Sequence, residues 1–198
     1  MTVSEIVKHL KFIYLSFSPY LDRNMRYESD IMKRKTKIMM ITVSSGIFAN
    51  TQEAIKEAKK GLLKDEVPVG AVLVSQGKII ARAYNKRQED RDATAHAEII
   101  CIKKACKKFK DFRLIDCELY VTLEPCLMCF GAILNARIKK VYFGASINKE
   151  GSIDCEEIIA RAELNHKCEI EKGLFEEECS NLVSDYFKSK RKKIKEVL

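Results

Sequence analysis

Apolar residues recur at helical spacing in several stretches of the chain. Asn50 and Glu53 have the spacing of a helix-capping box and precede an apolar stripe with a period of 3.6 residues. Because Pro68 follows shortly after this stripe, the pattern predicts a helix over 50–63. Further helices are predicted over 95–109, from Pro125 onward and over 174–194.

Short runs rich in β-branched and apolar residues predict the strands. Residues 69–75 and 78–84 are separated by Gln76 and Gly77, which is typical of a β-hairpin. Two further strands are predicted over 118–123 and 140–143. Helices that alternate with strands after an opening hairpin favour an α/β class, with a mixed sheet and helices on its faces.

The first 40 residues differ from the rest of the chain, because they mix apolar pieces and charges without a clean period. One explanation is that the start codon at Met1 is assigned too early and that translation begins at Met39 or Met40. Acidic residues such as Glu5 and Asp22 count against a transit peptide. We therefore expect residues 1–40 to be an extension, disordered or a start-site artefact, and residues 41–198 to form a single domain.

Composition and charge narrow the classes of function. The 198 residues are 46% hydrophobic and carry 36 Lys and Arg against 28 Asp and Glu, a formal charge of +8. This charge favours a polyanionic partner, with RNA or DNA as the first candidates. No apolar run approaches the roughly 18 residues of a membrane span, so we expect a soluble protein. Eight cysteines without an export signal favour reduced thiols in the cytoplasm.

Two short motifs carry the candidate chemistry: His96-Ala97-Glu98 and Pro125-Cys126-Leu127-Met128-Cys129. Singly, His96 suits a core position, and the cysteines suit buried thiols or a redox pair. Cys126 and Cys129 are three residues apart, so both sulfurs lie on one helical face. His96 and Glu98 are about 200° apart around a helix, so both reach one ion only beyond the helix end.

Two helix N-termini aimed at one point satisfy that condition and also favour thiolates. His96, Cys126 and Cys129 then supply three zinc ligands, and the open fourth position is typical of a catalytic site with one Zn²⁺ per subunit. Glu98, close but unligated, is the candidate proton carrier. An H-x-E motif followed by P-C-x-x-C is typical of zinc nucleobase deaminases.

These motifs resemble those of the bacterial tRNA-specific adenosine deaminases, within the cytidine deaminase superfamily. The matching text spans residues 66–143 most closely, with the runs EVPVGAV, TAHAE and LYVTLEPCLMC. The resemblance implies a three-layer α/β/α cytidine deaminase-like fold with a central mixed sheet of about five strands. It also implies that His96, Cys126 and Cys129 bind zinc and that Glu98 moves protons.

The resemblance further assigns substrate contacts. It implies that Asn85 hydrogen-bonds a flipped base in a pocket lined by Val69, Gly70 and Ala71. It places Asn165 and His166 near an RNA-binding groove. It also places a basic C-terminal helix, with Phe187, Lys188 and Arg191, on the anticodon stem-loop. A frayed, solvated helix end remains the alternative for the basic run. In that helix the apolar pattern predicts inward-facing side chains at Leu174, Leu182, Val183 and Phe187.

The reaction that the resemblance implies is hydrolytic deamination of adenosine to inosine at wobble position 34 of a tRNA, an arginine tRNA being expected. It also implies a homodimer in the cytoplasm, with no membrane and no DNA partner. The alternatives are a small-substrate zinc deaminase for cytidine, deoxycytidylate or guanine, and a zinc-stabilised RNA-binding module without catalysis. Ala93, where the family usually has proline, and the acidic segment 148–162 depart from the family pattern.

Overall fold

The computed structural model describes residues 45–146 and 165–197. The chain divides into two compact units, Met1–Gly46 and Ile47–Leu198. The helices and strands described below belong to the second unit, except that the first described helix begins at residue 45. The expected extension 1–40 and the acidic segment 148–162 lie outside the described residues. In the part of the chain that is described, no helix is both long and apolar enough to cross a bilayer.

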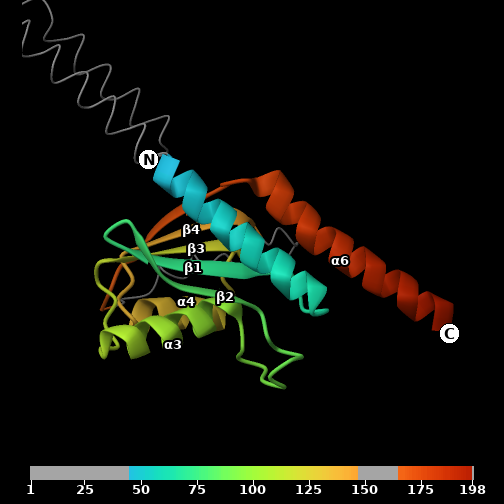
Figure 1. Cartoon of the computed structure of the whole chain (residues 1–198), viewed down its shortest axis with the longest axis horizontal. Helices are drawn as coiled ribbons and strands as arrows, with labels where there is room; N and C mark the ends of the chain where they lie inside the picture. The colour runs from blue at the N-terminus through green and yellow to red at the C-terminus, as the bar shows by residue number, and fades with distance from the viewer. Residues whose placement is uncertain (1–44, 147–164, 198) are drawn as a thin grey trace, which may run out of the picture. The chain divides into compact units, whose positions relative to one another are not determined.

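Five strands form one mixed sheet in the order β2-β1-β3-β4-β5 (Figure 1). Strand β1 is antiparallel to both of its neighbours, β2 and β3, whereas β3 and β4, and β4 and β5, are parallel pairs. The expected α/β class with a mixed sheet is therefore confirmed. The strands are β1 (Gly70–Ser75), β2 (Lys78–Tyr84), β3 (Cys117–Leu123), β4 (Lys140–Ala145) and β5 (Glu169–Lys172).

The predicted hairpin is confirmed between β1 and β2, where Ser75 pairs with Lys78. Its two turn residues, Gln76 and Gly77, have φ values of 49° and 71°. Positive φ at both positions matches the turn that follows the right-handed twist of paired strands.

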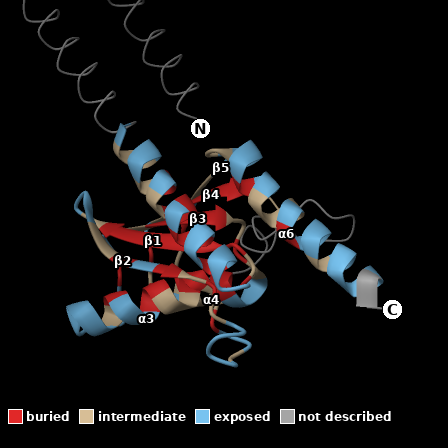
Figure 2. Cartoon of the chain, turned by 45° about the vertical axis from the view of Figure 1, so that its right-hand side comes forward, coloured by how far each residue is buried: buried red, intermediate tan, exposed pale blue. Residues whose placement is uncertain are grey.

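Helices cover both faces of the sheet, as Figure 1 shows. The helix over 45–63 and α6 (Glu176–Val197) lie on one face, and α3 (Ala97–Phe109) and α4 (Leu127–Asn135) on the other. Strand β1 is buried on both sides: Ala71 and Leu73 pack in the core shared with α3 and α4, and Val72 packs with Ala54 of the first helix. Figure 2 shows the buried strands between helices with exposed outer faces. The expected three-layer fold is confirmed.

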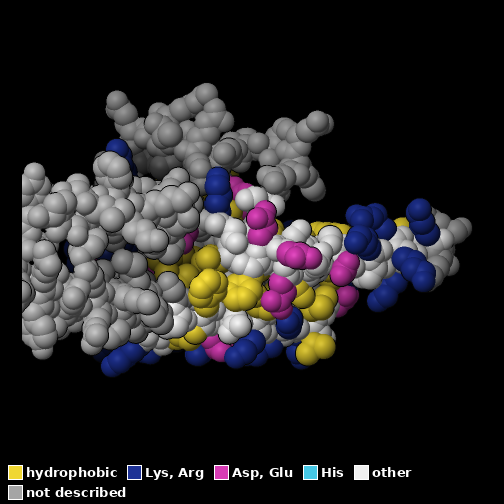
Figure 3. Space-filling view, turned by 90° about the horizontal axis from the view of Figure 1, so that it is seen from above, with side chains coloured by type: hydrophobic (Ala, Val, Ile, Leu, Met, Phe, Trp, Pro, Cys, Tyr) yellow, Lys and Arg dark blue, Asp and Glu magenta, His cyan; other side chains and the backbone are white. Residues whose placement is uncertain are grey.

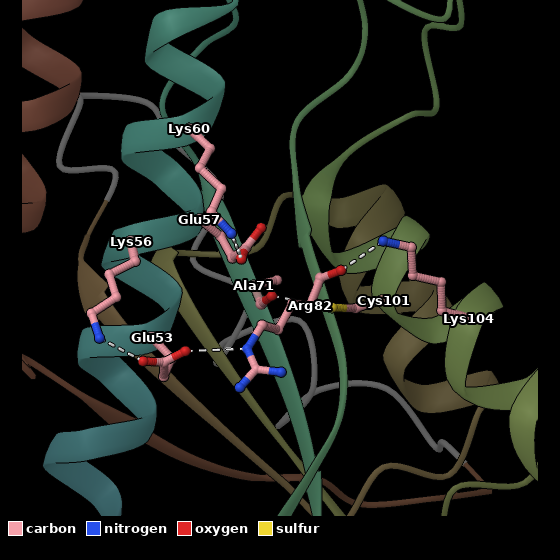
Figure 4. A network of polar contacts seen from close by, with 8 residues as sticks. All are labelled: Glu53, Lys56, Glu57, Lys60, Ala71, Arg82, Cys101 and Lys104. Carbon is pink, nitrogen blue, oxygen red and sulfur yellow. Dashed lines mark hydrogen bonds and ion pairs between the residues drawn. The ribbon is translucent and has the colours of Figure 1, made fainter.

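Polar contacts connect the hairpin to both helical layers (Figure 4). Arg82 Nε of β2 donates to Glu53 Oε2 of the first helix at 3.1 Å, and Lys104 Nζ of α3 donates to the Arg82 carbonyl oxygen at 2.7 Å. Inside, the Cys101 thiol of α3 donates to the Ala71 carbonyl of β1 at 3.2 Å. Exposed ion pairs of this kind stabilise a fold little, so their main effect is on alignment of the layers.

All four predicted helices begin at residues other than those that the pattern predicted, and α6 begins at Glu176 rather than at residue 174. The first helix already spans 45–63, so Asn50 lies inside it and the predicted start was wrong. Ile47 packs against the buried cluster that contains Ala54 and Val72. This packing stabilises helical turns before Asn50, where the capping pattern had predicted the helix to start. Helix α3 starts at Ala97 rather than near residue 95, and α4 starts at Leu127, which leaves Pro125 before its N-cap.

The apolar face of α6 was predicted only in part. Leu174 precedes the helix, and Leu182 and Val183 are partly buried, but Phe187 is 43% exposed and Tyr186 is buried instead. The Tyr186 hydroxyl donates to the Asp65 carbonyl oxygen at 3.0 Å, which fixes the rotation of the helix about its axis.

Close packing between β1 and the first helix depends on Gly70. A Cβ at this position would lie 2.0 Å from the Ala54 carbonyl oxygen and 2.4 Å from the Ala58 nitrogen, both of which are backbone atoms. We expect Gly70→Ala to push the helix away from the sheet and to lower the free energy of unfolding by about 3 kcal/mol, measured by urea denaturation.

Gly131→Ala is the matched control, because a Cβ at Gly131 of α4 would meet no heavy atom of the described residues within 4 Å apart from its chain neighbours and its own helix backbone. It should leave stability unchanged or raise it by up to about 1 kcal/mol through helix propensity. Equal stability of the two variants would contradict the packing role of Gly70.

Candidate metal centre and active site

His96 is the N-cap residue of α3, yet its side chain makes no capping hydrogen bond. Asn85, the residue that follows β2, caps the helix instead: its Oδ1 accepts a hydrogen bond from the Ala97 amide at 2.9 Å. Because Asn85 satisfies this amide, the His96 imidazole is left to point beyond the helix end.

Cys126 and Cys129 occupy the corresponding place on α4. Cys126 is the N-cap residue, with φ −70° and ψ 168°, and makes no side-chain capping bond. Cys129 lies in the first turn and is fully buried. The two sulfurs therefore extend from a helix N-terminus, as the imidazole does on α3.

The structure brings these three side chains together. His96 Nδ1 lies 3.7 Å from Cys126 Sγ and 3.4 Å from Cys129 Sγ, and one donor atom from each residue lies within 4.8 Å of the others. In a tetrahedral zinc site, a Zn–N bond of about 2.0 Å and a Zn–S bond of about 2.3 Å place the N and S atoms about 3.5 Å apart. The donor set and its spacing fit zinc.

Charges within this cluster favour a thiolate. A hydrogen bond from the Cys129 thiol, with a second from His96, lowers the pKa of Cys126 to about 3. The same hydrogen bond raises the pKa of Cys129, and the hydrogen bond with Cys126 raises the pKa of His96. A thiolate is the form of cysteine that ligates metals.

Glu98 lies in the first turn of α3 and is 3% exposed. Its Oε2 is the one buried side-chain N or O atom without a hydrogen-bond partner among the described residues. Burial raises the pKa of this carboxyl group. An unpartnered buried oxygen is costly to a fold, so it points to a role with a ligand or substrate.

The predicted pocket residues Val69, Gly70 and Ala71 are consecutive in the sequence but contact different layers of the fold. The core that contains α3 and α4 includes Val69 and Ala71. Gly70 instead faces the first helix, and its amide donates to the buried Thr122 hydroxyl at 3.1 Å. The structure thus gives Gly70 a packing contact, and Val69 and Ala71 the face of the sheet that carries the cluster.

Asn165 and His166, the pair predicted at the RNA groove, follow the segment 147–164 that the structure does not describe. They contact the residues just after α4. His166 Nε2 lies 2.8 Å from the Ile138 carbonyl oxygen. Arg137 Nη1 donates to the Asn165 carbonyl oxygen at 2.9 Å, which leaves the exposed Asn165 side chain outside this contact.

The residues predicted on the C-terminal helix lie on an exposed surface. Figure 3 shows Lys and Arg side chains gathered over the C-terminal half of α6. Phe187 stands edge-on to Tyr186 at 5.3 Å between ring centroids, Lys188 pairs with Asp185 at 3.2 Å, and Arg191 is exposed. Exposed cations beside an exposed ring are typical of a surface that binds a polyanion.

Two buried polar residues near the site were not singled out from the sequence. Thr122 and Glu66 are 0% and 1% exposed. Glu66 was read only as part of a motif, and with Asp65 directly before it the local sequence does not distinguish it from a solvated acidic residue. Its partners lie more than twenty residues away, so spacing alone does not reveal them.

Comparison with known proteins agrees with this site. Residues 48–145 match the model of the cytidine and deoxycytidylate deaminase zinc-binding region. The tRNA-specific adenosine deaminase of Bacillus subtilis is 48% identical over 145 residues, 73% of this chain and 90% of that protein. That of Aquifex aeolicus is 45% identical over 142 residues, 71% of this chain and 93% of the relative.

Solved structures agree in fold. A structure from studies of A-to-I editing by tRNA:A34 deaminases at the wobble position of transfer RNA superposes with a TM-score of 0.64 at 41% identity, covering 68% of this chain and 98% of that chain. A guanine deaminase from Nitrosomonas europaea, at 23% identity and a TM-score of 0.61, shares the fold, covering 70% of this chain and 83% of that one. The chain belongs to the tRNA-specific adenosine deaminases, a family of zinc-binding cytidine deaminase-type enzymes.

Proposed function

We propose that the chain is a zinc-dependent hydrolase that converts the wobble adenosine of a tRNA to inosine and releases ammonia. The observation that carries this proposal is the unpartnered Oε2 of Glu98 beside the cluster of His96, Cys126 and Cys129. A structural zinc site has no use for an unligated buried carboxyl group. The relatives named above supply the substrate class.

His96, Cys126 and Cys129 would hold the ion, one per chain. When bound, zinc supplies a water molecule whose pKa is lowered to about 7. Glu98 would accept one proton from the attacking water at Oε2 and deliver it to N1 of adenine, which would make C6 electrophilic. Once the water oxygen has added to C6, Glu98 would carry the remaining proton of that oxygen to the amino group, and the C6–N bond would break to release ammonia.

Asn85 would orient the base. Because its Oδ1 accepts the Ala97 amide hydrogen bond, its Nδ2 is the group left to donate to an acceptor on the purine. Val69 and Ala71 belong to the face of β1 that carries the cluster and would form the apolar floor of the pocket. The base must leave its stack to enter, and this is least costly in a single-stranded loop.

The RNA would be gripped outside the pocket. We propose that α6 contacts the anticodon stem-loop through Phe187, Lys188 and Arg191, and that Asn165 and His166 line the adjoining groove. Phosphate contacts by these cations would supply salt-dependent affinity without base selectivity. The finer assignments, an arginine tRNA as substrate and a homodimer in the cytoplasm, belong to the same proposal.

A stem-loop assay tests the substrate. The purified protein, incubated with an anticodon stem-loop that carries adenosine at the wobble position, should form inosine there, as detected by nuclease digestion and mass spectrometry. We expect no inosine at the other loop adenosines, because the pocket receives one extruded base.

Free cytidine, deoxycytidylate and guanine serve as the competing substrates under the same conditions. Deamination of one of these at a rate above that of the stem-loop would favour the small-substrate alternative. Stem-loop binding without any deamination would favour the non-catalytic RNA-binding alternative.

A further inference from the structure

Glu66 is a buried carboxyl group that lies outside the metal cluster. It is 1% exposed, and its Oε1 accepts two backbone hydrogen bonds, from the Gln88 amide at 2.7 Å and from the Glu89 amide at 2.8 Å. A buried carboxyl group is costly unless its hydrogen bonds are made, so these two contacts define its place in the fold.

The two amides belong to a loop, residues 86–95, that joins Asn85 to His96. Its ends are held together, because the Lys86 amide donates to the Ala95 carbonyl oxygen at 2.9 Å. The residue before the loop caps α3 and the residue after it belongs to the metal cluster. Movement of this loop therefore acts directly at the rim of the candidate site.

Glu66 connects this loop to the strand that carries the pocket. The Glu66 amide donates to the Gly61 carbonyl oxygen at 3.0 Å, which ties residue 66 to the end of the first helix. Four residues beyond Glu66 the chain enters β1, and the Asn85 amide donates to the Val69 carbonyl oxygen at 3.0 Å. The carboxyl group thus spans two segments that both border the site.

The loop carries exposed cations. Arg87 and Arg91 are exposed, and Arg91 has a φ of 50°, a backbone conformation that the surrounding contacts must maintain. Lys86, in contrast, is paired with Glu89 at 2.6 Å. Two exposed cations on the loop that joins Asn85 to His96 suit the phosphates that flank an extruded base.

We propose that Glu66 is a positioning residue that holds the loop over 86–95, with Arg87 and Arg91, in the arrangement that binds the RNA around the target nucleotide. This inference rests on the proposed function for its substrate class. Glu66 touches neither the metal cluster nor the reacting base; it acts through the Gln88 and Glu89 amides.

The anchoring itself is tested without substrate. In Glu66→Ala, hydrogen exchange at the Gln88 and Glu89 amides should accelerate at least about tenfold, because each lost hydrogen bond removes its share of protection. Trypsin should cleave after Arg87 and Arg91 faster than in the wild type. In Glu66→Gln the amide oxygen accepts the same two bonds, so protection should return. Unchanged exchange in Glu66→Ala would overturn the proposal.

The role in RNA binding is tested by fluorescence anisotropy with the labelled stem-loop, which needs no turnover. We expect the Kd of Glu66→Ala to rise about tenfold, with zinc content unchanged and with recovery in Glu66→Gln. A merely structural role would lower the fraction of folded protein and leave the Kd of that fraction unchanged. An unchanged Kd with a loosened loop would therefore overturn the substrate part of the proposal.

Glu57→Ala is the matched control, since Glu57 is another buried carboxyl group, 6% exposed, that pairs with Lys60 instead of the loop. It should leave loop exchange and Kd as in the wild type. If Glu66→Ala does not fold, Glu66→Asp shortens the side chain by one methylene and serves the same comparison. Absence of inosine in the wild type would contradict the proposed function alone, because exchange and Kd are read without catalysis.

Discussion

Replacement of Glu98 by glutamine is expected to abolish turnover while the metal stays bound. The amide cannot accept and return a proton, and general acid–base catalysis of this kind contributes about 10²–10⁴ in rate. Because Glu98 serves both proton transfers, we expect kcat on the stem-loop to fall toward the upper end, about 10⁴-fold. Zinc content, measured by atomic emission, should remain at about one ion per chain.

The size match between the two side chains makes this variant informative. Glu98 is buried at the start of α3, and glutamine preserves its volume, so the helix start should not move. Glu57→Gln, at a buried carboxyl group outside the site, is the control and should keep full activity. Residual turnover within about tenfold of the wild type would show that Glu98 is not the proton carrier. Loss of zinc together with activity would instead place Glu98 among the ligands.

Predictions from the sequence succeeded where the determining contacts are local. The three-residue spacing predicted that the sulfurs of Cys126 and Cys129 meet, and they do, although Cys126 is the N-cap residue of α4 and only Cys129 lies within the helix. The condition that a shared ion lies beyond the helix end also came from local geometry, and it agrees with His96 and Cys126 as N-cap residues. The hairpin likewise depends on two turn residues, Gln76 and Gly77.

Predictions failed where distant contacts override a local signal. The capping box at Asn50 was valid as a local pattern, but Ile47 gains more from packing in the core than the chain gains from a cap. Phe187 and Tyr186 are neighbours with similar apolar character, and only the hydrogen bond of Tyr186 to Asp65 decides which of them is buried. Strand β5 is four residues long with both ends exposed, so it has too little pattern to be recognised.

The candidate site shows the same division. The residues proposed to bind metal follow from two short motifs, whereas the groups that hold those motifs in place do not. Asn85 caps α3 from twelve residues upstream, and Glu66 reaches the loop from more than twenty residues away. Gly70 was expected in the pocket because of its neighbours in the motif, and its contact with Ala54 becomes visible only once the helix is placed against β1.

Removal of one sulfur ligand is the second prediction with a large expected effect. We expect Cys129→Ala to lower zinc affinity by more than about a hundredfold, since loss of an outer-shell partner alone typically costs 10- to 100-fold. Inosine formation should fall below detection. The core around the cluster contains many buried side chains from β1, β3 and β4, so the protein should still fold, with a lower Tm because metal binding no longer adds to stability.

Cys106→Ser provides the matched control, because Cys106 lies on α3 outside the cluster and is only partly buried. Its zinc content and activity should equal those of the wild type. Dialysis of the wild type against a chelator should reproduce the activity loss of Cys129→Ala, and added zinc should restore the wild type but not the variant. A Cys129→Ala protein that retains one tightly bound zinc ion would mean that the ion is held elsewhere, and the deaminase site built on His96, Cys126 and Cys129 would have to be abandoned.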